Sequence, residues 1–211
     1  YRDPNSPYRS WYDFDPKYKG GYRSWWGFET LPEVNEENPS YVEFITGEGG
    51  VIDTWLRRGA AGFRLDVADE LPDDFIEKIR AAVKRVSPEK FLLGEVWEDA
   101  TTKYGFGQRR TYLLGKGLDS VMNYPFKNAV LDFVKGKPAE QAMGEILSIC
   151  EHYPAPAMDT ALNFLSTHDT ERALTVIADE PANGRGREWQ SGRCVVGEAY
   201  EEGMLRLRKI G

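Results

Sequence analysis

The chain has 211 residues, of which 41% are hydrophobic and 29% are charged, so we expect it to bury a core rather than to be disordered. A net charge of −7 and the lack of a basic cluster argue against nucleic acid or an anionic membrane as a partner. No apolar stretch approaches the roughly 20 residues of a membrane span, and no signal-peptide pattern opens the chain. Two cysteines, two histidines and no CxxC spacing indicate neither a disulfide framework nor a structural zinc site.

The first 38 residues differ from the rest of the chain. They are dense in Tyr, Trp, Pro, Gly and Asp and have no sustained period of 2 or 3.6 residues, which predicts an irregular, loop-rich segment. Aromatic side chains in this segment could stack on a ligand, but their number favours packing within a small lobe; they include Trp11, Tyr12, Trp25 and Trp26.

A regular pattern begins after Asn38-Pro39. Residues 40–58 predict a helix that "GEGG" weakens in its middle, and residues 61–67 predict a strand. Pro72 then opens an amphipathic helix that ends before Ser87-Pro88.

Strands and helices continue to alternate beyond this point. Short apolar runs predict strands, and amphipathic runs predict helices; the strands are 90–96, 118–124 and 161–167, and the helices are 125–136, 138–153 and "EEGMLRLRKI" near the end. This alternation predicts βαβ units and a parallel sheet whose strands are buried on both faces.

Three of the predicted strands carry an acidic residue at or just past their C-terminal end: Asp66, Glu95 and Asp169. Asp66 and Glu95 are separated by about the length of one βαβ repeat, so one right-handed crossover would place them on neighbouring parallel strands. Such strands lie about 4.8 Å apart, which suits the ~5–5.5 Å between the two carboxyl groups of retaining glycosidases. The alternative is three unrelated surface acids.

Arg64 stands two residues before Asp66 and therefore on the same face of the predicted strand. In a buried parallel strand this cation is well placed to favour the ionised form of Asp66. The alternative is an ordinary ion pair on the wet side of an antiparallel strand.

Four motifs carry a family resemblance. "LPEVN", "GFRLDVADE", "LLGEVWED" and "FLSTHDTER", in this order, resemble sequence signatures of the α-amylase family of glycoside hydrolases, and their form is most similar to the neopullulanase, cyclomaltodextrinase and maltogenic amylase branch. The resemblance implies an α/β fold that is part of a TIM (β/α)8 barrel, about strands 4 to 7. It assigns residues 1–38 to the C-terminal part of an inserted small domain and residues 39–211 to a partial barrel.

The resemblance also implies roles for individual residues. Asp66 matches the nucleophile, Glu95 the general acid/base, and Asp169 the carboxylate that holds sugar hydroxyls and stabilises the transition state. Arg64 matches the arginine that orients the nucleophile, and His168 matches a histidine that hydrogen-bonds the sugar.

Two further candidates border the leaving-group side of the implied site. Glu70 and Trp97 could contact substrate there, although a packing role for Trp97 is an equal alternative. The chain departs from the branch at Asp69, where Asn is usual, and at Glu98, where His is common, so the resemblance leaves substrate preference open.

The resemblance implies a retaining hydrolase of α-1,4-glucosidic bonds, with α-1,6-glucosidic bonds as a second option, acting on starch-type glucans, maltooligosaccharides, cyclodextrins or pullulan. The chemistry requires no cofactor, and structural calcium stays an option. The family's first signature, an Asp followed four residues later by Asn-His, is absent from the 211 residues. We therefore expect them to show little activity alone, with self-association left open. The compartment is undetermined, with the bacterial cytoplasm favoured over secretion.

Two other functions fit parts of the pattern. The first is a non-catalytic binding or accessory relative with the same barrel, although such relatives typically lack one or more of the three acids. The second is a metal-dependent hydrolase that uses Asp66, Glu95, His168 and Asp169 as ligands; Arg64 beside a proposed ligand and the lack of a second nearby histidine argue against it.

Overall fold

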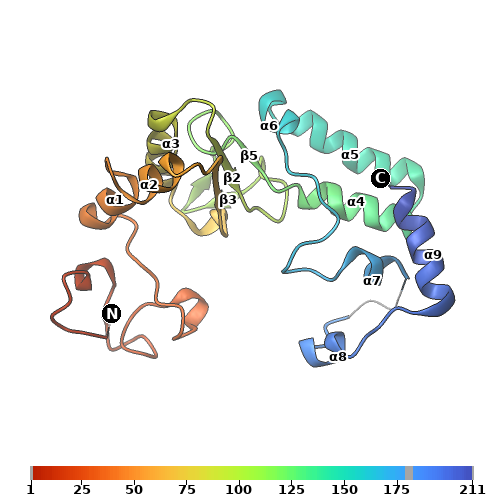
Figure 1. Cartoon of the computed structure of the whole chain (residues 1–211), viewed down its shortest axis with the longest axis horizontal. Helices are drawn as coiled ribbons and strands as arrows, with labels where there is room; N and C mark the ends of the chain where they lie inside the picture. Colours follow the sequence, from red (N-terminus) through yellow and green to blue (C-terminus); the bar gives the residue numbers. More distant parts are fainter. Residues whose placement is uncertain (1, 179–182, 211) are drawn as a thin grey trace. The chain divides into compact units, whose positions relative to one another are not determined.

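A computed structural model describes residues 2–178 and 183–210 (Figure 1). They form two compact units: residues 2–95 with 104–119, and residues 96–103 with 120–178 and 183–210. The chain therefore leaves the first unit directly after Glu95, the proposed acid/base, and returns to it at Tyr104. Within the described ranges no helix is both long enough and apolar enough to cross a bilayer.

The N-terminal segment of the first unit is irregular, as predicted. It contains only isolated antiparallel bridges and two short 3-10 helices, η1 (Arg9–Trp11) and η2 (Trp25–Gly27). The Trp11 ring lies 5.2 Å from the Tyr41 ring, and its indole N–H donates to Ser40 Oγ at 2.7 Å, so Trp11 packs as expected. Trp26 contradicts the packing expectation, because 75% of it is exposed.

Two helices replace the single helix predicted over residues 40–58. These are α1 (Pro39–Thr46) and α2 (Val51–Arg57). Asn38 caps α1 by accepting hydrogen bonds from the Ser40 and Tyr41 amides. The break lies at "GEGG", where Gly49 has a φ of +76° and a Cβ on Gly50 would come within 2.7 Å of the Phe44 carbonyl oxygen. The prediction was wrong here because these glycines form a turn.

The centre of the first unit is a βαβ arrangement, as the alternation predicted. Strand β1 (Gly62–Leu65) pairs in parallel with β2 (Phe91–Gly94), and α3 (Asp73–Val86) connects them. A Cβ on Gly62 would lie 2.0 Å from the Phe91 carbonyl oxygen, so only glycine allows the strands to approach this closely. The apolar face of α3 is buried and consists of Phe75, Ile76, Ile79, Ala82 and Val83.

The return of the chain to the first unit begins with a short hairpin that the sequence pattern did not predict. Strands β3 (Tyr104–Gly105) and β4 (Gln108–Arg109) are antiparallel, and the turn between them has positive φ angles at Phe106 (52°) and Gly107 (77°). The returning segment ends at Asp119, which ties β2 to α3.

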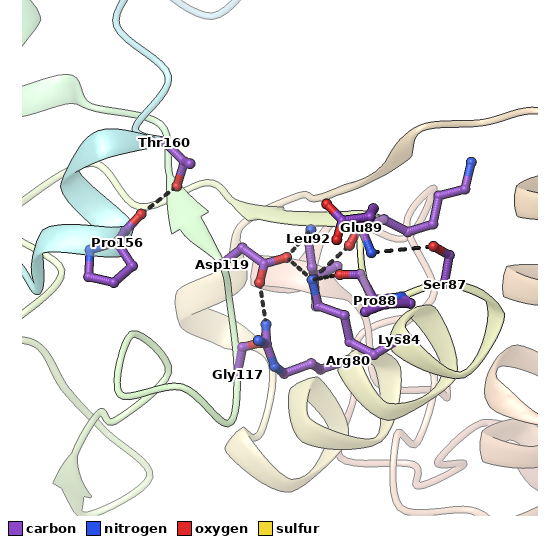
Figure 2. Close-up of polar contacts among 11 residues, drawn as sticks. Arg80, Lys84, Ser87, Pro88, Glu89, Leu92, Gly117, Asp119, Pro156 and Thr160 are labelled. Atoms are coloured by element: carbon purple, nitrogen blue, oxygen red, sulfur yellow. Dashed lines mark hydrogen bonds and ion pairs between the residues drawn. The ribbon is translucent and has the colours of Figure 1, made fainter.

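Asp119 holds the first unit together through three donors. Figure 2 shows its carboxylate between Arg80 Nη1 at 2.6 Å and Lys84 Nζ at 2.8 Å, both from α3, and the Leu92 amide donates to it at 2.8 Å. Burial alone would raise the pKa of Asp119, but the hydrogen bonds from Lys84 and Arg80 outweigh burial and hold that pKa below its usual range. Because Leu92 lies in β2, this cluster positions the strand that leads to Glu95.

We expect Asp119→Asn to destabilise the full-length protein by about 3 kcal/mol at neutral pH, because two cations lose their partner at a site that is only 16% exposed. The carboxyl pKa is lower in the folded state, so the stabilisation is present above the unfolded-state pKa of about 4 and disappears as the pH falls through the folded-state pKa. Thermal unfolding of both forms across this pH range measures the difference. Glu89→Gln, an exposed carboxylate on the neighbouring loop, is the matched control. A constant difference down to acidic pH would contradict the ion-pair explanation.

The second unit is mainly helical. Helices α4 (Tyr124–Val134) and α5 (Ala139–His152) lie side by side, and α7 (Ala173–Ala178) contacts α9 (Gly197–Arg208), as Figure 1 shows. The shorter elements are strand β5 (Ser120–Val121) and helices α6 (Ala155–Asp159) and α8 (Arg187–Ser191). A cluster of Leu131, Ala173 and Ile177 is buried between α4 and α7.

The strand predicted over residues 161–167 is not formed. The segment makes a single parallel bridge, between Leu162 and Met122. Its partner stops early because Asn123 caps α4, accepting a hydrogen bond from the Phe126 amide at 3.2 Å. The helix thus begins where the predicted strand 118–124 was to continue, and the partner ladder is too short for a strand.

Candidate active site

Asp66 and Glu95 follow the last paired residues of two adjacent parallel strands. The final pair in the β1–β2 register is Leu65 with Gly94, and the ladder continues one step beyond it. The Glu95 amide donates to the Leu65 carbonyl at 2.9 Å, and the Ala68 amide donates to the Glu95 carbonyl at 3.0 Å. The predicted adjacency of the two acids is therefore confirmed.

Arg64 joins the two acids. Its guanidinium forms an ion pair with Asp66 and a second one with Glu95, where Arg64 Nη2 lies 3.0 Å from Glu95 Oε1. The side chain of Asp66 is 76% exposed, whereas that of Glu95 is 3% exposed. One carboxylate is thus open to an incoming molecule and the other is enclosed, and a single cation holds both. The strand that carries this pair is parallel to its neighbour, whereas the alternative interpretation required an antiparallel strand.

Val67 contributes through its backbone. Its amide donates to Glu95 Oε2 at 2.8 Å, so the enclosed carboxylate is held at both oxygens. Val67 has a φ of 41° and a ψ of 54°, a left-handed conformation that costs a β-branched residue about 1–3 kcal/mol. Strain of this kind concentrates at functional sites, and here it lies directly after Asp66. No sequence pattern signals it.

The turn after Asp66 is supported by Arg110, a residue that the sequence interpretation missed. Arg110 is 3% exposed and donates to the carbonyls of Asp69 at 2.6 Å and Leu71 at 2.7 Å and to the Asp73 carboxylate at 2.8 Å. Tyr112 donates to Asp69 Oδ1 at 2.8 Å. The departure from the family pattern at Asp69 therefore has a partner inside this unit, and Arg110 sits too far along the chain to be associated with Asp66 by spacing.

Glu70 binds the tryptophan pair of the N-terminal segment. Its Oε2 accepts a hydrogen bond from the Trp25 indole at 2.5 Å, and its Oε1 accepts one from the Trp26 indole at 2.8 Å. The two indoles are stacked, with ring centroids 5.0 Å apart and planes 18° apart. Glu70 therefore connects the turn that follows Asp66 to residues 44 and 45 positions earlier in the chain.

Trp97 lies in the second unit, where its ring stacks on Tyr124 with a centroid distance of 4.5 Å. Because 44% of it stays exposed, packing and ligand contact are both compatible with its position. Two contacts anchor the residues that follow: Asp99 Oδ2 lies 2.6 Å from His152 Nδ1, and the Ala100 amide donates to the Tyr153 hydroxyl at 3.2 Å.

Two of the residues in these contacts, Asp99 and Tyr153, have shifted pKa values. Burial alone would raise the pKa of Asp99, but hydrogen bonds from Thr101 and His152 outweigh it and lower that pKa. Burial raises the pKa of Tyr153 to about 12, so its hydroxyl stays protonated. Glu98, the other departure from the family pattern, pairs with Lys103 at 2.6 Å.

His168 and Asp169 form a pair of their own in the second unit, with His168 Nε2 3.1 Å from Asp169 Oδ2. The turn is set locally, because the Asp169 amide donates to Thr167 Oγ1 and the Thr167 amide donates to Thr170 Oγ1. The pair lines a cavity of about 980 Å³ together with Lys127, Arg187 and Trp189 among others. Burial lowers the pKa of Lys127.

Residues 2–178 and 183–210 contain no group of three His, Cys, Asp or Glu side chains placed to hold a metal ion. The geometry places one exposed and one enclosed carboxyl group at the ends of adjacent strands, and a pair of carboxyl groups is what hydrolysis of a glycosidic bond requires.

Comparison with known proteins agrees with this geometry. A family model described as "Alpha amylase, catalytic domain" matches residues 8–191. The chain belongs to the α-amylase family, and its βαβ arrangement is part of a TIM barrel.

Several relatives span much more chain than these 211 residues. An amylopullulanase of Thermoanaerobacter thermohydrosulfuricus is 36% identical in an alignment that covers 85% of this chain and 13% of that protein. A cyclomaltodextrinase of a Bacillus species is 37% identical, covering 70% of this chain and 25% of that protein. The ligand-free structure of the cyclic α-maltosyl-(1→6)-maltose hydrolase from Arthrobacter globiformis matches with a TM-score of 0.73 and 27% identity, over 84% of this chain and 39% of that structure.

Proposed function

We propose that the protein is a retaining glycoside hydrolase that cleaves α-1,4-glucosidic bonds of starch-type glucans, with α-1,6 bonds as a second target. The observation that carries this proposal is the group formed by Asp66, Arg64 and Glu95 at the ends of two adjacent parallel strands. The relatives described above are named an amylopullulanase, a cyclomaltodextrinase and a cyclic α-maltosyl-(1→6)-maltose hydrolase, and these names support an α-glucan as the substrate class.

In the first step, a carboxylate oxygen of Asp66 attacks the anomeric carbon while Glu95 gives its proton to the departing glycosidic oxygen. The bond to the leaving sugar breaks, and a glycosyl ester on Asp66 forms. In the second step, Glu95 takes a proton from a water molecule whose oxygen attacks the same carbon and releases Asp66. Arg64 contacts both carboxylates and orients them through the two steps.

His168 and Asp169 are proposed to bind sugar hydroxyls. The support for this is that both side chains are accessible, at 75% and 40% exposure, and line one polar cavity. A hydroxyl-rich ligand suits such a lining because a carboxylate accepts, and an imidazole can donate, hydrogen bonds to hydroxyl groups.

The full-length protein is expected to retain the configuration of the anomeric carbon, because two displacements at one carbon restore it. Proton NMR of the first product released from maltooligosaccharides should show the α-anomer before mutarotation. An initial β-anomer would contradict the assignment of Asp66 as nucleophile. Binding of glucans without any hydrolysis would instead favour the non-catalytic accessory function.

We also propose that the 211 residues expressed alone hydrolyse maltooligosaccharides poorly, because the first family signature is absent from them. Release of reducing sugar, compared with that from the full-length protein at equal molar concentration, measures this difference. Equal activity of the two would contradict the proposal.

A further inference from the structure

We propose that Trp26 is a stacking platform for a glucose unit of the α-glucan and that Glu70 is the residue that positions it. This inference rests on the proposed function for the identity of the ligand. It concerns a residue outside the catalytic group, in the irregular N-terminal segment.

The first observation is that Trp26 is exposed. Trp26 is 75% exposed, whereas its neighbour Trp25 is partly buried. One face of the Trp26 indole lies against Trp25, with the planes only 18° apart, which leaves the opposite face as the accessible one. Leaving a large aromatic face in water forgoes hydrophobic stabilisation, so an occupant of that face is favoured.

The second observation is that the ring is rigidly held. Both indole N–H groups donate to one carboxylate, that of Glu70, at 2.5 and 2.8 Å. Trp26 also has a φ of 51°, a left-handed conformation that is uncommon for a bulky residue. A platform that is fixed before the ligand arrives loses little conformational entropy on binding, and backbone strain of this kind concentrates at binding sites.

The third observation is the location. Glu70 is the last residue of the 3-10 helix η3 (Ala68–Glu70), which begins two residues after Asp66. The same turn is fixed by Arg110 and Tyr112. Trp26 is thereby tied to the segment that carries the proposed nucleophile, all within the first unit.

A glucose unit fits this platform chemically. One face of a pyranose ring presents C–H groups that pack flat on an indole, while the hydroxyl groups at its rim remain free for water or polar side chains. The carboxylate of Glu70 already accepts two hydrogen bonds, so its role is to hold the rings rather than to react. Trp26, held by Glu70, would thus supply a sugar contact beyond the reacting bond.

The test compares Trp26→Ala with Trp55→Ala in the full-length protein. Trp55 is also exposed, at 53%, but lies on α2 with its ring beside Arg58. We expect Trp26→Ala to raise KM for maltohexaose about tenfold with kcat nearly unchanged, and to leave a short aryl maltoside within about twofold, because a remote contact that is equal in ground and transition states affects KM alone. Trp55→Ala should leave both substrates unchanged. Equal KM values for wild type and Trp26→Ala on maltohexaose would overturn the inference.

Two variants of Glu70 test whether this residue positions the Trp26 ring. Glu70→Ala should raise KM for maltohexaose as Trp26→Ala does, and Glu70→Gln, which keeps one acceptor oxygen, should restore part of the affinity. The double variant Trp26→Ala/Glu70→Ala should be no worse than Trp26→Ala, since Glu70 acts through the ring. An additive loss in the double variant would show that Glu70 does not act through Trp26.

A measurement without turnover separates this inference from the proposed function. Two proteins are compared, Glu95→Gln and the double variant Glu95→Gln/Trp26→Phe, so that the sugar is not consumed. Acrylamide quenching of their tryptophan fluorescence is measured with and without maltohexaose. Loss of the Trp26 contribution to quenching on addition of sugar supports the platform even if the full-length protein proves unable to hydrolyse glucans. A Trp26 signal that is already unquenchable without sugar would overturn it, since another part of the protein would then cover the ring.

Discussion

Replacement of Asp66 with Asn is expected to reduce turnover of every glucan by about 10⁴-fold or more in the full-length protein, because an amide cannot form the glycosyl ester. Removal of the nucleophile affects the first step for good and poor leaving groups alike, so an activated aryl glucoside should lose as much activity as maltohexaose. Initial rates for both substrates, normalised to folded protein, measure the effect.

The fold should survive this change. The Asp66 side chain is 76% exposed, and replacement of exposed side chains usually alters stability by less than about 0.5 kcal/mol. Asp74→Asn, in the exposed first turn of α3, is the matched control and should keep full activity. If Asp66→Asn retained measurable turnover of the aryl glucoside alone, Asp66 would not be the nucleophile.

Replacement of Glu95 with Gln is expected to slow hydrolysis of natural glucans by about 10²–10⁴-fold, the usual contribution of a general acid/base. An aryl glucoside with an acidic leaving group needs no proton from Glu95, so formation of its glycosyl ester should be largely spared. Azide should then restore turnover, because it attacks the anomeric carbon and releases Asp66 without a general base. The expected product is the α-glucosyl azide, which NMR identifies.

Replacement of Glu95 is expected to affect the stability of the fold more than replacement of Asp66. It is 3% exposed and accepts from the Val67 amide, so Glu95→Gln must be checked by thermal unfolding before its rates are interpreted. The amide of Gln keeps an acceptor for Val67 but weakens the contact with Arg64. Equal loss on both substrates with no effect of azide would show that Glu95 is not the acid/base.

The sequence alone determined the family and the order of elements around the first two acids. The four motifs occur in the order found in the family. Two short apolar runs with an amphipathic helix between them predicted the β1–α3–β2 arrangement, which the structure confirms. Adjacency of Asp66 and Glu95 follows from a single short crossover, because the chirality and length of such a connection leave almost no other arrangement. Motifs and strand or helix patterns involve residues close together in the chain, so the sequence alone shows them.

The exact backbone turns, and the contacts between residues far apart in the chain, became known only from the tertiary structure. The glycine turn that divides α1 from α2 and the cap at Asn123 that shortens the predicted strand 118–124 show how local backbone geometry overrides an apolar pattern. Glu70 was predicted to contact substrate, and its role there is untested, but the structure shows that it binds Trp25 and Trp26. The left-handed Val67 and the buried Arg110 had no sequence pattern at all. Such features depend on which side chains the folded chain brings within hydrogen-bond distance, and that distance is a property of the packed structure rather than of spacing along the sequence.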